Sequence, residues 1–161
     1  TLLENYVDSM QAVKIGRGHF FFVPRDFAAR LQVFEDFVEM LEEHNQLKRP
    51  DRDPLEVNSI YVVDDAKQRK KMTAAFYRSV RREIAEYEER VTHLIQSGSQ
   101  SPKIMDRWVM RIQGLEEKKR NYENILKREL TDLDEAFTSL RYLSDELRIR
   151  AAGLRVHPKA A

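Results

Sequence analysis

The sequence contains no cysteine, which excludes disulfide bridges and thiolate chemistry and is compatible with a reducing compartment, so we expect a cytoplasmic protein. It also lacks a run of about 18 apolar residues, so no membrane-spanning helix is predicted. No signal peptide is visible. Glycine and proline number five each, and neither lies between Leu115 and Ala152, so nothing forces a helix to break there.

Charged residues make up 34% of the 161 residues, which suits one domain with long solvated helices. The charge is uneven. Residues 1–64 hold 7 Lys/Arg and 12 Asp/Glu (7 − 12 = −5), whereas residues 65–161 hold 21 and 15 (21 − 15 = +6). The first residue is Thr1, so we expect a piece of a longer protein.

Two apolar rows predict a pair of long helices that fold back on each other. The second row alternates steps of three and four residues, the heptad period of a helix that faces a partner; it is Met105, Trp108, Ile112, Leu115, Lys119, Tyr122 and Leu126. The first row is looser: Met72, Phe76, Val80, Ile84, Tyr87, Val91 and Leu94. Between them, Gly98, Ser101 and Pro102 predict a short reversal. We expect the Lys119 stem to lie along the seam with its ammonium in water; a register-setting role is the alternative.

Apolar residues continue beyond Leu126 in a shifted row: Leu130, Leu133, Phe137, Leu140, Leu143 and Leu147. We interpret this as one long helix with a stutter or kink near residues 129–131. A separate helix capped by Thr131 is the alternative. In either case we expect this part to pack on the N-terminal head.

The N-terminal residues, which we call the head, are predicted to form a small unit of β-strands and one helix. Residues 12–15 and 19–23 are β-prone runs around Gly16-Arg17-Gly18, which predicts a hairpin. A helix is expected from residue 25 to 45, and a third strand from residue 57 to 63. The predicted fold class is therefore mainly α (α+β): a β/α head over residues 1–64, an antiparallel helical hairpin over 65–152 that forms one folding unit with the head, and a flexible tail over 153–161.

No motif predicts catalysis. The glycines around Arg17 lack the Lys-Ser/Thr of a phosphate-binding loop, and a plain turn is favoured. The aromatic strand that follows these glycines is weakly similar to the RNA-binding strand of RNA-recognition motifs, but the order of the predicted elements differs from that fold. The four histidines are isolated, so no metal site is expected. We predict no cofactor and no small-molecule substrate.

A basic face on the first long helix is the strongest electrostatic feature. Over residues 65–82 only Asp65 offsets seven basic residues. The candidate nucleic-acid contacts are Lys67, Lys70, Lys71, Tyr77, Arg78, Arg81 and Arg82. The alternative is a solvated face, partly neutralised by Glu123 and Glu129 of the facing helix.

The run from Gly18 to Pro24, the Val62-Val63-Asp64-Asp65 segment and the Lys118-x₃-Tyr122-Glu123-x₂-Leu126 pattern resemble an uncharacterised family of phage, plasmid and prokaryotic proteins. In that family a Gly-aromatic-Val-Pro hairpin precedes a coiled coil. The resemblance covers about residues 12–147. It implies no activity and no residue role, and it favours a viral or mobile-element origin.

The favoured function is non-enzymatic macromolecular interaction, with the helical stalk as a scaffold or oligomerisation surface. A protein partner or self-association is expected, nucleic-acid binding through the basic face is the second hypothesis, and an enzyme is the third. Apolar residues off the main seam are the candidate protein contacts: Ile95, Ile104, Val109 and Ile125. Their alternative is a wider core face, because a three-helix contact needs more than a two-residue seam.

Overall fold

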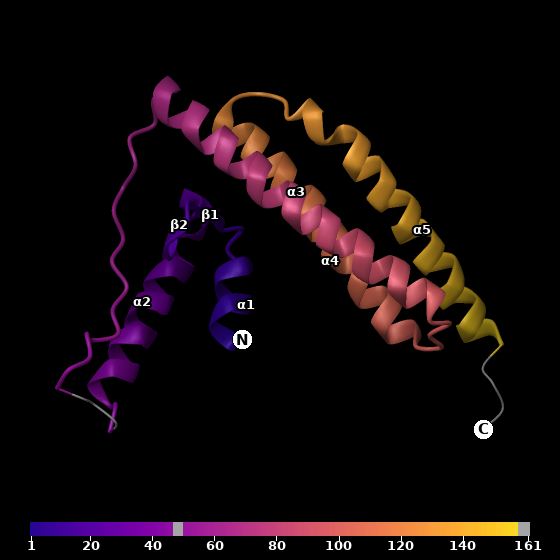
Figure 1. Cartoon of the computed structure of the whole chain (residues 1–161), viewed down its shortest axis with the longest axis horizontal. Coiled ribbons are helices and arrows are strands. Elements are labelled where there is room, and N and C mark those ends of the chain that lie inside the picture. Colours follow the sequence, from indigo (N-terminus) through magenta and orange to yellow (C-terminus); the bar gives the residue numbers. More distant parts are fainter. Residues whose placement is uncertain (47–49, 158–161) are drawn as a thin grey trace. The chain divides into compact units, whose positions relative to one another are not determined.

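The computed structural model describes residues 1–46 and 50–157. The chain divides into two compact units, residues 1–69 and 70–161. The mainly α fold class with a small β element is confirmed (Figure 1). The described helices and strands are α1 (Leu2–Asp8), β1 (Val13–Ile15), β2 (Phe20–Phe22), η1 (Arg25–Phe27), α2 (Ala28–Glu43), α3 (Ala66–Gln96), α4 (Pro102–Leu126), η2 (Thr131–Leu133) and α5 (Asp134–Val156).

The first unit begins with a short helix that the sequence pattern did not reveal. Thr1 and Glu4 form a capping box at the start of α1, in which each side chain accepts from the other residue's backbone N–H. Tyr6 of α1 stacks on Phe34 of α2 with ring centroids 5.7 Å apart, and its hydroxyl donates to the Arg30 carbonyl at 3.0 Å. The Arg30 guanidinium lies over the Tyr6 ring at 5.3 Å. These contacts pack α1 against α2.

The predicted hairpin is confirmed as the antiparallel pair β1–β2, with Lys14 opposite Phe21. Gly16 in its turn has φ 66°, a backbone conformation that glycine adopts without steric cost. The helix expected over residues 25–45 is present as the single turn η1 followed by α2.

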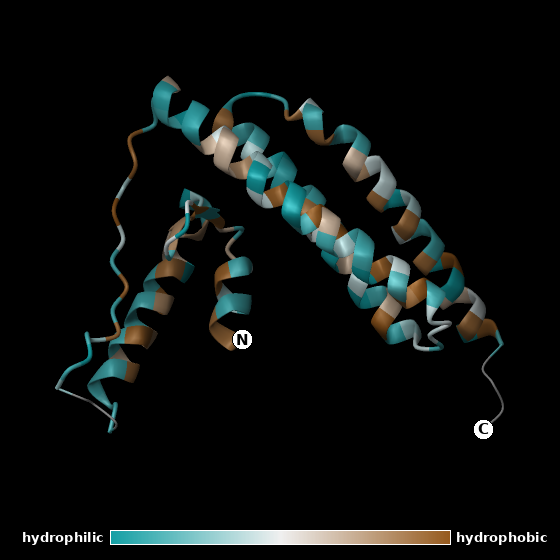
Figure 2. Ribbon diagram, in the orientation of Figure 1, coloured by the Kyte–Doolittle hydropathy of each residue, from teal (hydrophilic) through white to brown (hydrophobic). Residues whose placement is uncertain are grey.

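The predicted third strand is wrong. Residues 57–63 form no strand, and the sheet has two strands in the described part of the chain. In Figure 2 the trace between α2 and α3 carries hydrophobic stretches, and Ile60 and Tyr61 are 88% and 98% exposed. The residues are β-prone, but β-propensity reflects packing on a pleated surface beside a partner strand, and the described residues provide no such strand beside this segment.

The predicted antiparallel pairing of α3 and α4 is confirmed by contacts that run in opposite directions along the two helices. Phe76 meets Tyr122 with ring centroids 4.4 Å apart, and Tyr87 meets Trp108 edge-on at 5.4 Å. The turn between the helices is built as the sequence predicts: Gly98 has φ 65°, and the Ser101 hydroxyl accepts from the Ile104 N–H at 3.4 Å ahead of Pro102.

The expectation of one continuous last helix is wrong. The α4 helix ends at Leu126, and Lys127 takes the left-handed conformation with φ 54°. The alternative of a separate helix is correct, although Thr131 begins the short turn η2 and does not cap α5. Leu130 and Leu133 are fully buried in this connection. Their burial stabilises a reversal that the sequence carries without glycine.

The reversal lays α5 antiparallel along α4 (Figure 1). Arg141 Nε donates to Glu116 at 2.7 Å, and Arg155 pairs with Asp106 near the other end of the two helices. The apolar core of this unit draws on all three helices: Met72, Ala75, Phe76, Val80, Ile84, Val91, Met105, Val109, Ile112, Leu115, Tyr122, Leu126, Leu130, Leu133, Phe137, Leu140, Leu147 and Ala151. That the segment after residue 126 packs on the head stays a prediction.

The predicted flexible tail begins too early, because α5 continues to Val156. Residues 158–161 of that tail lie outside the described residues.

Candidate functional site

The basic face of α3 keeps all of its predicted cations in solvent. Lys67, Lys70, Lys71, Arg78, Arg81 and Arg82 are exposed and Tyr77 is half-buried. At 100° per residue, Lys67, Lys71, Arg78 and Arg82 lie opposite the side of α3 that buries Phe76, Val80 and Ile84. Lys70 and Arg81 flank these four, and Tyr77 lies at the border of the buried side. The Arg81 guanidinium lies over the Tyr77 ring at 5.2 Å, which holds that cation beside an aromatic surface.

The alternative interpretation was that carboxylates of the facing helix partly neutralise this basic face. Glu123 does not neutralise it. Glu123 instead pairs with Lys119 of its own helix at 2.7 Å. Within the residues that the structure describes, no ion pair joins Lys70, Lys71, Arg78, Arg81 or Arg82 to a carboxylate. The face therefore presents five unneutralised cations along 13 residues, or about 18 Å of helix.

The four predicted protein contacts do not form one surface. Val109 is 8% exposed, so its assignment as an exposed contact is wrong; it belongs to the wider core face that three helices require. Ile95 and Ile125 are half-buried, and Ile104 is 40% exposed. Since α4 contacts both α3 and α5, it buries apolar residues on two sides, which a single seam does not reveal.

A different apolar surface lies on α5, where Tyr142, Ile149 and Val156 are 73%, 73% and 71% exposed. The three residues are seven apart and so form one line along the helix, which we call the α5 row. The opposite side of α5 buries Phe137, Leu140 and Leu147. Sequence reasoning missed this row because the leucines of the same helix form the stronger pattern; its spacing of seven was the available signal.

Ion pairs border the α5 row. Arg148 pairs with Asp145 at 3.6 Å, and Arg150 pairs with Glu146 at 2.8 Å. An apolar centre with a polar rim of paired charges is the usual anatomy of a protein–protein contact.

Lys118 is a buried charge that the sequence pattern concealed. The pattern placed Lys119 in the seam, but Lys118 is the residue that is only 7% exposed, and its Nζ lies 3.1 Å from Oε1 of Glu83 on α3. Beside this pair, burial and the Glu83 carboxylate raise the pKa of the Tyr122 phenol. The Lys119 ammonium pairs with Glu123 and with Asp134 of α5 at 3.2 Å. Both lysines thus join helices.

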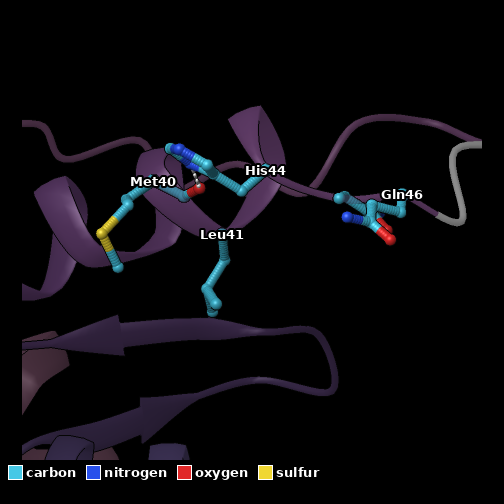
Figure 3. Close-up of a pocket in the computed structure, with 5 residues that line it drawn as sticks. Met40, Leu41, His44 and Gln46 are labelled. Carbon is cyan, nitrogen blue, oxygen red and sulfur yellow. Dashed lines mark hydrogen bonds between the residues drawn. The ribbon is translucent and has the colours of Figure 1, made fainter.

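Shallow hollows are present in the described part of the chain, and two of them are lined by several polar residues. The first, at the end of α2, is lined by Met40, Leu41, His44, Asn45 and Gln46 (Figure 3). In Figure 3 the His44 ring lies back on its own helix, with Nδ1 2.9 Å from the Met40 carbonyl oxygen. This arrangement gives no nucleophile and base within hydrogen-bonding distance.

The second hollow lies beside the Asp106–Arg155 pair and includes Lys103, Arg107 and Met110. Over the described ranges, no group of three or more His, Asp or Glu side chains is placed to hold a metal ion. No described helix is long and apolar enough to cross a membrane.

The model of a family of unknown function (DUF6744) matches residues 1–153. No curated protein and no solved structure matches the chain.

Proposed function

This chain belongs to the DUF6744 family of unknown function, and we propose that it is a non-enzymatic interaction module whose helical unit binds another protein molecule through the α5 row. The observation that carries the proposal is the alignment of three large, exposed apolar side chains at heptad spacing on a helix whose other side is already buried. Scattered exposed apolar residues are ordinary in proteins, whereas a line of them at steps of seven is typical of a helix that contacts a further helix.

The chemistry of the α5 row favours an amphipathic helix as its occupant. The row extends from Tyr142 to Val156, about 21 Å, which equals about four turns of a partner helix. Burial of an aliphatic or aromatic side chain contributes about 1.5–3 kcal/mol. Three such side chains contribute about 4.5–9 kcal/mol before the entropy cost of association, so the apolar side chains of the partner must add to this burial to give a micromolar contact.

The test is a photo-crosslinking amino acid at position 149, in the cells that make the protein, with the same group at Gln113 as the control. Gln113 is exposed on α4 and lies off the row. We expect a discrete protein adduct from position 149 and none from Gln113, with the partner identified by mass spectrometry. Equal labelling from both positions would count against the proposal. Light scattering of the purified protein then shows whether the partner is a second copy.

A second candidate function is nucleic-acid binding through the basic face of α3, supported by the five cations without a neutralising carboxylate. If all five contact phosphates, log K for a single strand falls with log salt with a slope of about −3.5. Reversing three of the charges (Lys71→Glu, Arg78→Glu and Arg82→Glu) should abolish binding in fluorescence anisotropy while helicity is retained.

The matched control for that experiment reverses three exposed cations on α4: Lys103→Glu, Arg107→Glu and Arg120→Glu. It changes the net charge by the same amount but leaves the α3 face intact. Loss of binding in both triple variants would indicate a general charge effect and would refute a site on α3.

We also propose a cytoplasmic location, in keeping with the absence of cysteine, and a phage or mobile-element origin.

A further inference from the structure

The segment between α2 and α3 exposes an unusual concentration of strand-forming apolar side chains. Within residues 55–63, Leu55, Ile60, Tyr61, Val62 and Val63 are 46%, 88%, 98%, 48% and 71% exposed. Residues 56–62 make no hydrogen bond within the described part of the chain. Exposed apolar stretches of this kind mark binding surfaces, and a strand-forming stretch with unpaired backbone groups suits addition to the edge of a sheet.

The β1–β2 hairpin offers such an edge. A two-stranded hairpin is marginal in water, and a third strand is what usually makes a small sheet stable. The hairpin has no third strand among the described residues, and Phe20 and Phe21 of β2 are 74% and 43% exposed. The segment therefore leaves apolar side chains and backbone groups uncovered, and the hairpin leaves the Phe20 and Phe21 side chains exposed with no third strand among the described residues.

The two surfaces are also complementary in charge. Residues 9–25 carry Lys14, Arg17 and Arg25 and no acidic residue, a formal charge of +3. Residues 51–65 carry five acidic residues against Arg52, a formal charge of 1 − 5 = −4; the five are Asp51, Asp53, Glu56, Asp64 and Asp65. Arg69 offsets one of these charges through its ion pair with Asp64 at 2.6 Å, so the segment remains acidic. Opposite charges favour encounter of segment and hairpin, and like charges disfavour pairing of two segments or of two hairpins.

We propose that residues 57–63 add as a third strand to the β1–β2 hairpin of a second copy of this chain, so that two copies exchange strands. A reciprocal exchange gives both copies a three-stranded sheet through one two-fold, self-complementary interface. The exchange uses a different surface from the α5 row, so each proposal can fail without the other.

The first experiment measures mass by light scattering over micromolar to near-millimolar concentration, for the wild type, Ile60→Pro and Ile60→Val. Proline removes a backbone donor and restricts φ, so it disrupts a strand ladder, whereas valine keeps the β-branched side chain and the N–H. We expect a wild-type dimer, retention of the dimer in Ile60→Val, and at least a tenfold weaker dimer in Ile60→Pro. A wild-type monomer throughout, or a dimer that Ile60→Pro leaves unchanged, would overturn the proposal.

The second experiment uses the absence of native cysteine. Differently tagged Tyr61→Cys and Phe20→Cys chains are mixed and oxidised, with Lys14→Cys replacing Phe20→Cys to test the β1 edge. We expect a mixed disulfide dimer with one of the two hairpin variants, well above the yield from Tyr61→Cys with Gln113→Cys. Two double variants, Tyr61→Cys/Phe20→Cys and Tyr61→Cys/Lys14→Cys, test pairing within one chain. If they form only intramolecular disulfides, and the mixtures of single variants form no mixed dimer, the segment pairs with its own hairpin. That result refutes the exchange.

Discussion

The Lys118–Glu83 pair yields the sharpest prediction about how the helical unit is held together. The two charged atoms lie 3.1 Å apart, and the side chains are 9% and 32% exposed. At an effective dielectric of about 20 their gross attraction is about 5 kcal/mol, much of which is offset by the desolvation of the two ions. The net effect of a substitution therefore depends on which charge is left behind.

Glu83→Gln leaves the more buried ion, the Lys118 ammonium, without its carboxylate. Lys118→Met leaves a carboxylate that still has one third of its side chain in solvent, and it retains an unbranched apolar stem. We expect Glu83→Gln to lower the free energy of unfolding by about 2–4 kcal/mol and Lys118→Met by about 1–2 kcal/mol. The double variant should lose no more than about 1 kcal/mol, because it leaves no orphaned charge.

The assay is urea unfolding followed by the fluorescence of Trp108, the single tryptophan of the chain. Trp108 lies on α4 in edge contact with Tyr87 of α3, so it reports on the α3–α4 contact directly. Circular dichroism of the same samples controls for loss of helix before unfolding. Additivity of the two substitutions within about 0.3 kcal/mol, or a larger loss for Lys118→Met than for Glu83→Gln, would refute the reasoning.

Three further predictions concern the same unit. Gly114 lies inside α4 with open space where a Cβ would be, so Gly114→Ala should stabilise the unit by about 0.5–1 kcal/mol, raising the urea midpoint. Gly98→Ala should lower that midpoint and reduce the free energy of unfolding by about 1 kcal/mol, because φ is 65° at Gly98. A change of the midpoint in the same direction for both glycine variants would contradict these expectations. The pKa of Tyr122 is raised by burial, so above about pH 10 the unfolded chain loses the phenolic proton first, and stability should fall by up to about 1.4 kcal/mol per pH unit. Tyr122→Phe should remove that part of the decline in urea titrations at pH 8–11, and identical pH slopes for the wild type and Tyr122→Phe would contradict this assignment.

Local signals were sufficient to predict several elements of the fold. The glycines around Arg17 predicted the β-hairpin, and the Gly98-to-Pro102 sequence predicted the reversal between α3 and α4. These features depend on backbone sterics and capping within a few residues, which the sequence contains in full. The basic face of α3 was also predictable, because helical periodicity alone separates it from the buried side.

Other features required the tertiary structure. The reversal at Lys127 carries no glycine or proline, and it exists because burying Leu130, Leu133 and the inner side of α5 outweighs the strain of one left-handed residue. The same packing decided that Lys118, and not Lys119, is the more buried lysine.

The sequence by itself therefore determined where the long helices lie over most of their lengths and which side of each is apolar, because these depend on spacing along the chain. It did not determine the short helix α1 or the break between α4 and α5. Only the tertiary structure decided how many neighbours each helix has. Placing α4 between two partners moved Val109 into the core and left the α5 row in solvent, since one apolar period cannot show whether a second side will be covered.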